Sequence, residues 1–280
     1  MKKLAVLLFI LLCISCSSSD SDSDIVSTNI DYYIEESRLF EGPSMTSHEK
    51  RRYDVVDGKW FSTTYLTGLH STFQTHFYSN GLLVAEHTNM DADYTYNGQQ
   101  LIAMRYSNYG GPEQYRRFVP MSATIYYIEV LTATYDDPST QMTGRFIVEL
   151  DADDNLVSVS EDANFDGVMD APRYFTYQNG DLITAEIANG TNYTYDYTDI
   201  VDNRNDIYEK TYGKKTANLI FIQQYLDIGS TGLLYSKHIK QNDFDNSQYT
   251  VLSNHFYKKR YSETSFGNTR SELTTTFYFK

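Results

Sequence analysis

The chain has 280 residues and a formal net charge of −14, with 26 tyrosines and 15 phenylalanines against a single tryptophan. An acidic chain lacks the cationic face that nucleic-acid phosphates require, so we expect no nucleic-acid partner. The charge also argues against electrostatic adhesion to anionic lipid, and the many aromatic residues favour pleated sheet.

The N-terminus has the features of a secretory signal. Lys2 and Lys3 precede an apolar run at residues 4–14. A run of about eleven residues suits a signal-peptide core and is too short to span a bilayer, which takes about 20 residues. We therefore expect residues 1–15 to be a signal peptide.

The end of this run resembles a bacterial lipobox, in which a small residue precedes the cysteine that is lipidated. Ser15 fits the small position and Cys16 the modified one, whereas Cys13 departs from the leucine usual at its position. The resemblance implies a lipid on Cys16 and membrane attachment through it. The alternative is a plain secretory signal cleaved near Ser15. The chain has no other cysteine, so we expect neither a disulfide nor a cysteine nucleophile in the folded part.

A serine- and aspartate-rich segment follows at residues 16–27. It has almost no apolar surface to bury, so we expect a disordered tether. An acidic tract directly after the lipid cysteine resembles the surface-export signal of Bacteroidota lipoproteins. This resemblance implies a cell-envelope, outer-membrane lipoprotein that reaches the cell surface. The alternative is a solvated linker that carries no address.

The remainder, residues 28–280, is expected to be all-β: an antiparallel meander of successive β-hairpins in an open or rolled sheet, with little helix. One domain is favoured over two smaller ones. Asn-Gly lies between alternating apolar runs at three places, and both residues tolerate the positive φ of tight hairpin turns. The expected turns are Asn80-Gly81, Asn97-Gly98 and Asn179-Gly180. A fourth hairpin is expected over residues 146–162, and a fifth begins at residue 193.

The hairpins share the order Tyr-x-Tyr, Asn-Gly and leucine. This order resembles the YD-type repeats of Rhs-like proteins, and it is closer to the small YD-like β-lipoproteins of Bacteroidota. The resemblance covers roughly residues 73–199. It implies architecture rather than activity, and the long shells and toxins of Rhs proteins are not implied. Residues 200–248 depart from the pattern: 217–229 fits a short helix or a buried strand, and 241–248 fits a polar loop.

Motifs of catalysis are scarce in this sequence. It has no Gly-x-Ser-x-Gly elbow, no His-Glu-x-x-His helix and no phosphate-binding glycine loop. His76 and His87 flank one hairpin, where two surface histidines are a simpler reading than a metal pair. Glu129 and Glu149 lie on expected strands and are read as exposed. Residues 108–118, rich in glycine and arginine, are the first choice for a binding loop.

The tyrosines could form a face that stacks sugar rings, although cross-strand packing explains them more simply. They are Tyr94, Tyr96, Tyr106, Tyr126, Tyr127, Tyr174, Tyr177, Tyr193 and Tyr195. Sugar platforms rely on tryptophan, and the chain contains only Trp60.

Residues 162–170, DANFDGVMD, match the spacing of a calcium loop. Oxygen ligands at alternate positions and a glycine at position six are typical of such loops. The expected ligands are Asp162, Asn164, Asp166, Val168 and Asp170, with Val168 contributing its carbonyl. Position twelve is Arg173 rather than glutamate, so the loop is not a complete EF-hand. The alternative is an acidic turn whose side chains cap their own backbone.

The sequence thus favours a lipid-anchored envelope protein with a non-catalytic binding or structural module, stabilised by calcium. Its ligand would be a glycan or a protein. The alternative function is a surface hydrolase of glycans, which would need a carboxylate pair that the sequence does not locate.

Overall fold

The computed structural model describes residues 29–67, 73–87, 90–108, 113–134, 136–187, 190–221 and 236–280. The expected signal peptide, Cys16 and the tether lie outside these residues. None of the helices in the described part of the chain is long and apolar enough to cross a membrane.

Within the described ranges, seventeen strands form one antiparallel sheet. They are β1 (Ile30–Glu41), β2 (Ser44–Val56), β3 (Lys59–Tyr65), β4 (Phe73–Ser79), β5 (Leu82–His87), β6 (Met90–Asn97), β7 (Gln100–Asn108), β8 (Glu113–Pro120), β9 (Ile125–Leu131), β10 (Met142–Leu150), β11 (Leu156–Glu161), β12 (Arg173–Gln178), β13 (Asp181–Ile187), β14 (Thr191–Thr194), β17 (Ser247–Val251), β18 (Tyr257–Phe266) and β19 (Thr269–Phe279). Strands β1 to β14 pair in chain order, and β1 also pairs with β19, which continues to β18 and β17. The prediction of an all-β antiparallel meander with little helix is confirmed.

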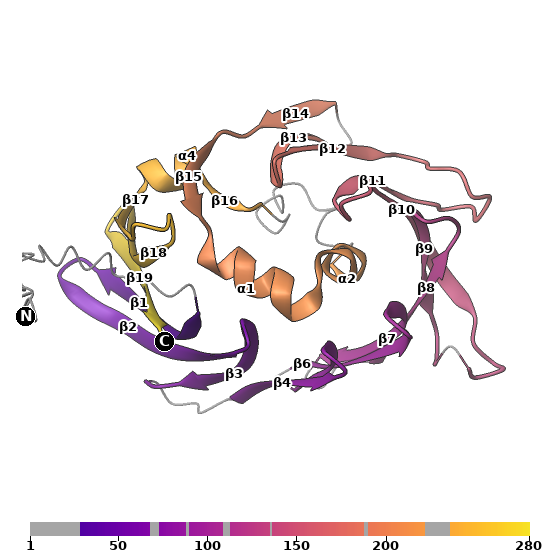
Figure 1. Cartoon of the computed structure of the whole chain (residues 1–280), viewed down its shortest axis with the longest axis horizontal. Helices are drawn as coiled ribbons and strands as arrows, with labels where there is room; N and C mark the ends of the chain where they lie inside the picture. Colours follow the sequence, from indigo (N-terminus) through magenta and orange to yellow (C-terminus); the bar gives the residue numbers. More distant parts are fainter. Residues whose placement is uncertain are drawn as a thin grey trace, which may run out of the picture.

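The sheet curls around two short helices, α1 (Asn203–Tyr212) and α2 (Lys214–Ile220), as Figure 1 shows. The sheet is not closed by the described strands, among which β14 and β17 are the ends of the pairing order. A two-stranded sheet of β15 (Tyr197–Val201) and β16 (His238–Lys240) lies between these ends in Figure 1, together with the helix α4 (Gln241–Asp245).

Local turn chemistry sets the hairpins. Asn80 and Gly81 have φ of 51° and 79°, and Asn179 and Gly180 have φ of 55° and 87°. Two consecutive residues at positive φ make the turn whose twist matches that of paired strands. The third turn lies one residue further along than predicted. Asn97 pairs with Gln100 at the strand ends, so Gly98 (φ 62°) is the first central residue.

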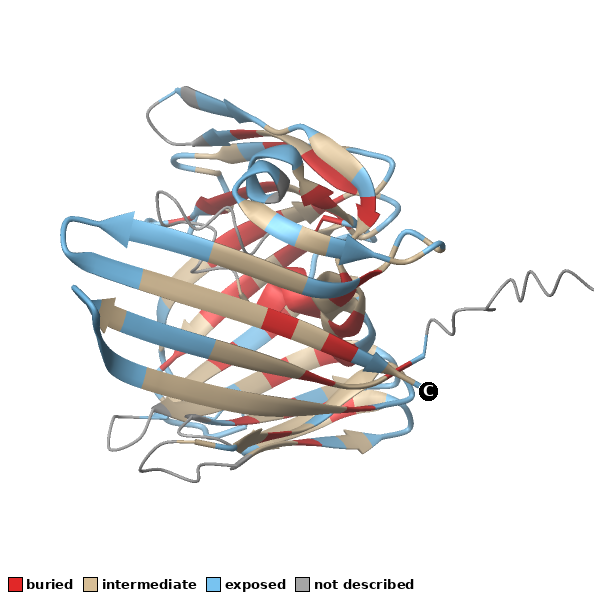
Figure 2. Cartoon of the chain, turned by 90° about the vertical axis from the view of Figure 1, so that its left-hand side faces the viewer, coloured by how far each residue is buried: buried red, intermediate tan, exposed pale blue. Residues whose placement is uncertain are grey.

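Two hydrophobic clusters fill the concave side of the sheet. The larger packs α2, through residues such as Leu219, against strands in the β5–β13 region. The smaller packs Ile207 of α1 against β1, β18 and β19. Trp60 on β3 packs against both clusters. The ends of β1, β2, β18 and β19 that carry their turns are exposed, and Figure 2 shows the buried stretches of these strands closer to the helices.

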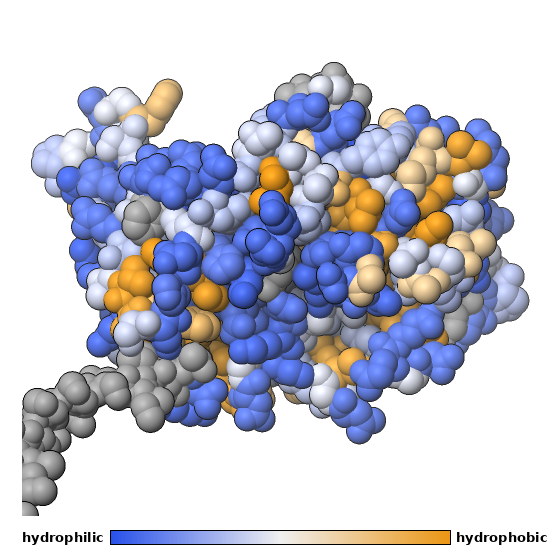
Figure 3. Space-filling model, turned by 45° about the horizontal axis from the view of Figure 1, so that its top comes forward, coloured by the Kyte–Doolittle hydropathy of each residue, from blue (hydrophilic) through white to orange (hydrophobic). Residues whose placement is uncertain are grey.

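The outer surface is mainly polar. On the face shown in Figure 3, hydrophilic residues predominate and hydrophobic ones form separate patches. This agrees with an acidic chain whose two buried hydrophobic clusters include residues of the helices.

Polar side chains fix α1 to strands on two sides of the curled sheet. The fully buried Asn203 donates to the Tyr257 carbonyl (2.7 Å) and accepts from the Tyr257 N–H (3.4 Å). Near the other end of α1, Thr211 Oγ1 accepts from the backbone N–H of Trp60 (3.0 Å). Helix α1 therefore bridges β18 and β3, and the strands β19, β1 and β2 lie between these two in the pairing order.

The region 200–248 differs from its sequence reading at three points. Residues 217–220 belong to helix α2, and the rest of 217–229 beyond Phe221 lies outside the described residues. The expected polar loop begins as the helix α4. The described strands do not form the expected fifth hairpin, because β14 pairs with β13 while β15 pairs with β16.

Replacing Asn203 by alanine should destabilise the fold markedly. The change leaves the buried backbone groups of Tyr257 without their partners, and each unsatisfied group costs about 1–3 kcal/mol. We expect Asn203→Ala to lower the free energy of unfolding by about 2–4 kcal/mol in urea titration. The exposed Asn242→Ala is the control and should change it by less than about 0.5 kcal/mol. Equal, small effects in both variants would contradict this docking of α1.

Candidate functional site

The loop predicted to bind calcium connects β11 to β12 and closes on a buried carboxylate. Asp162 is 0% exposed, and its side chain accepts from Arg145 Nε at 2.6 Å. The Asp162 oxygens also accept from the backbone N–H groups of Asp166 and Gly167, both at 3.1 Å. The side chain at the first ligand position is thus bound to a cationic side chain from β10.

The other predicted ligands form hydrogen bonds within the loop. Asn164 donates to Asp166 (3.2 Å), which accepts from the Val168 N–H (2.9 Å), and Asp170 accepts from the Ala163 N–H (2.7 Å). Val168 itself is 60% exposed. These are the contacts expected of the alternative, an acidic turn that caps its own backbone. Calcium would have to share the Asp162 carboxylate with Arg145, which pairs with its Oδ2 atom.

Within the described part of the chain, no three acidic, histidine or cysteine side chains are placed to hold one cation. Calcium binding therefore stays a prediction with a direct test. Calcium bound by this loop must raise the melting temperature in millimolar calcium relative to chelator, and Asp166→Ala must abolish the rise. An unchanged melting temperature, or an equal rise in Asp166→Ala, would leave only the hydrogen-bonded turn.

The histidines of the β4–β5 hairpin do not face each other. His76 pairs with Glu86, whereas His87 pairs with Thr75 and packs edge-on against Phe77, on the opposite face of the sheet. His76 is 2% exposed, and its ring nitrogens have no hydrogen-bond partner among the described atoms. The prediction of two surface histidines is therefore wrong for His76.

Burial lowers the pKa of His76 to about 4. The unfolded chain binds a proton near pH 6.5, so it takes up protons before the folded chain does. The contribution of neutral, buried His76 to stability is then fully present above pH 6.5 and is lost as the pH falls towards 4. Between these pH values, we expect the free energy of unfolding to fall by up to about 3 kcal/mol more in wild type than in His76→Leu. His87→Gln, at an exposed position, should keep the wild-type pH dependence, and an unchanged dependence in His76→Leu would contradict this burial.

The remaining predicted candidates have structural roles. Residues 109–112 of the proposed binding loop lie outside the described residues, and Arg116 beyond them is buried and donates to the Ile220 carbonyl (2.8 Å). Glu129, predicted to be exposed, is only 8% exposed and pairs with Arg117.

Several of the predicted sugar-stacking tyrosines pack into or against the larger hydrophobic cluster, namely Tyr94, Tyr96, Tyr106, Tyr126, Tyr177 and Tyr195. They do not form one exposed face.

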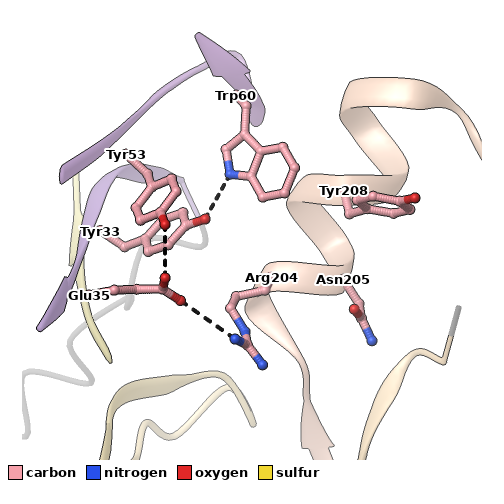
Figure 4. A pocket seen from close by; sticks show the side chains of 7 residues that line it. All are labelled: Tyr33, Glu35, Tyr53, Trp60, Arg204, Asn205 and Tyr208. Atoms are coloured by element: carbon pink, nitrogen blue, oxygen red, sulfur yellow. Dashed lines mark hydrogen bonds and ion pairs between the residues drawn. The ribbon is translucent and has the colours of Figure 1, made fainter. Parts of the chain in front are cut away.

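A pocket of about 390 Å³ lies between helix α1 and strands β1 to β3. Its lining residues are Tyr33, Glu35, Tyr53, Trp60, Arg204, Asn205 and Tyr208. Figure 4 shows the residues of α1 on one side and the aromatic and acidic residues of the strands on the other. Arg204, Asn205 and Tyr208 are spaced i, i+1 and i+4, which brings them to one face of the helix.

The aromatic wall of this pocket is held in place. Tyr33 and Tyr53 face each other across β1 and β2, and their rings stack at 4.4 Å. Trp60 Nε1 donates to the Tyr33 hydroxyl at 2.9 Å. Tyr208 packs edge-on against the Trp60 ring, with 6.0 Å between ring centroids. Each ring is thus fixed by a neighbour from a different element.

The polar groups of the pocket centre on one ion pair. Glu35 accepts from the Tyr53 hydroxyl (2.9 Å) and lies 3.5 Å from Arg204 Nη1. Burial acts to lower the pKa of Arg204, but the neighbouring Asp202, Tyr257 and Glu35 outweigh it and raise the pKa. Arg204 is therefore a permanent cation at this site. Its Nε has no hydrogen-bond partner among the described atoms, and the Asp202 carboxylate lies 4.0 Å away.

Sequence reasoning did not find this pocket. Glu35 and Arg204 lie far apart in the chain, and α1 was not predicted as a helix. The signal that was available is Trp60, the only tryptophan in the sequence.

Comparison with models of known protein families gives no match for this chain, and comparison with curated protein sequences gives none either.

Proposed function

We propose that the protein is a lipid-anchored envelope module that binds a ligand without transforming it, in the pocket between α1 and β1–β3. The observation that carries this proposal is a preformed aromatic pocket that contains a paired guanidinium and carboxylate. Ligand sites of this kind are concave, mainly aromatic or apolar, and carry a few placed polar groups.

The carboxylates favour binding over glycan hydrolysis. A glycosidase needs two carboxyl groups about 5–10 Å apart across the bond that it cleaves. Among the described residues that line the pocket, Glu35 is the only carboxylate. Glu86, whose pKa is raised by burial, accepts from the Tyr94 hydroxyl instead and does not line the pocket.

The attachment to the membrane rests on the sequence. Cys16 with Ser15 before it supports lipidation, and the serine–aspartate segment that follows supports a tether. Lipidation at one cysteine adds two or more acyl chains, which is enough for stable anchoring. The resemblance to YD-like lipoproteins of Bacteroidota supports an outer-membrane location at the cell surface. The acidic charge supports a ligand other than nucleic acid.

Metabolic labelling with a fatty-acid analogue tests the anchor. The wild-type protein should incorporate label and sediment with membranes, because its acyl chains partition into the bilayer. Cys16→Ala should incorporate none and be released. Cys13→Ala is the matched control and should be labelled like wild type. Equal labelling of wild type and Cys16→Ala, or an unlabelled wild type, would refute the anchor.

A further inference from the structure

We infer that the pocket beside α1 binds a neutral pyranose ring, one sugar unit of a glycan. This inference rests on the proposed function, because it names the ligand class of the same site. Three properties of the pocket support it: its aromatic walls, its mixture of hydrogen-bond donors and acceptors, and its charge.

The aromatic walls suit the C–H faces of a sugar ring. Trp60 contributes the largest aromatic side chain, and Tyr208 stands edge-on to it. Trp60 is fixed at three points: its indole N–H bonds Tyr33, its backbone N–H bonds Thr211, and its carbonyl accepts from Tyr78. A rigid platform loses little conformational freedom when a ligand stacks on it. The only tryptophan of the chain therefore lies where a stacking residue is needed.

The polar groups suit vicinal hydroxyls, each of which both donates and accepts. Arg204 supplies N–H donors on the pocket side, and Glu35 supplies carboxylate acceptors next to them. Asn205 donates to the Ser236 carbonyl at 2.8 Å, which fixes its amide and leaves Oδ1 as an acceptor. Figure 4 shows the Arg204 side chain paired with Glu35, with Asn205 next to Arg204 on α1. The pocket therefore offers both hydrogen-bond donors and acceptors.

The charge of the pocket selects against ionic ligands. Arg204 lies between Glu35 at 3.5 Å and Asp202 at 4.0 Å, so the three side chains together carry one negative charge. An anionic ligand would meet this excess and the overall charge of −14. A cationic ligand would have to approach the guanidinium of Arg204. A neutral polyol avoids both costs and uses the same groups as hydrogen-bond partners.

The size of the pocket fits one ring within a longer chain. Its volume of about 390 Å³ lies at the small end of the range for ligand sites, roughly 300–1,000 Å³. The pocket is open to solvent, so the units that flank the bound ring can leave through its mouth. A surface-anchored protein could in this way hold a polysaccharide by a single unit.

The fluorescence of Trp60 reports binding directly, because no other tryptophan contributes to the emission. The purified full-length protein in detergent is titrated with neutral oligosaccharides of glucose, xylose, mannose, galactose and N-acetylglucosamine. Oligogalacturonate is the anionic counterpart, and oligomeric chitosan the cationic one. We expect at least one neutral oligosaccharide to change the emission saturably, and neither charged counterpart to do so. The same samples are assayed for new reducing ends, which we expect to be absent.

Two conservative variants link the signal to the pocket. Glu35→Gln and Arg204→Lys should each weaken binding about tenfold or more, because a hydrogen bond to a charged group is lost or misplaced. Arg105→Gln, which removes an exposed ion pair with Asp93 outside the pocket, should bind like wild type. Circular dichroism identifies any unfolded variant, and Glu35→Gln keeps the test decisive if Arg204→Lys does not fold.

The outcomes separate the two proposals. Saturable binding of a charged oligosaccharide alone would overturn the neutral-sugar inference and retain the pocket as a binding site. No emission change with any probe would overturn the inference and remove the support for a binding function. Binding that both variants leave unchanged would place the ligand elsewhere and overturn the inference. New reducing ends that disappear in Glu35→Gln would overturn the non-catalytic function instead, and favour the hydrolase.

Discussion

Helix α1 is held inside the curled sheet by side chains that hydrogen-bond the backbones of two strands well separated in the pairing order. Asn203 bonds both backbone groups of Tyr257 on β18, and Thr211 accepts from the backbone N–H of Trp60 on β3. A sheet with an apolar concave face needs an element to cover it. Side-chain bonds to backbone groups specify where that element lies, because a helix shifted by one residue would leave buried groups unpaired. Helix α2 is placed in the same way, by Asn218 bonding the Asp154 carbonyl (2.8 Å).

The pocket is a consequence of this attachment. Thr211 draws β3 against α1, and the same contact places the Trp60 ring beside Tyr208. Arg204, one residue after Asn203, then meets Glu35 on β1. The residues of α1 that line the pocket lie between the two residues that anchor the helix, Asn203 and Thr211. Formation of the pocket and docking of the helix are therefore one event, and the pocket is preorganised to the extent that the helix is docked.

The sequence predicts the part of this fold that local chemistry controls. Asn179 and Gly180 specify a turn wherever they occur between apolar runs, so the hairpins could be located without any long-range information. Helix α1 could not, because its buried face includes the polar Asn203 and Thr211, and no apolar repeat of helical period appears. The loop at 162–170 shows a different limit. A calcium loop and a capped turn use the same residues, and the side chain that contacts Asp162, Arg145, comes from another strand.

Hydrogen exchange of the backbone amides in α1 tests most directly whether the helix is an integral part of the sheet. An isolated helix of this length is marginal in water and exchanges rapidly. If α1 is locked between β18 and β3, its amides open only with the whole domain, and their protection should equal that of the central residues of β1. Rapid exchange throughout α1, while β1 to β3 stay protected, would contradict the account, because the helix would then be attached too loosely to shape a pocket.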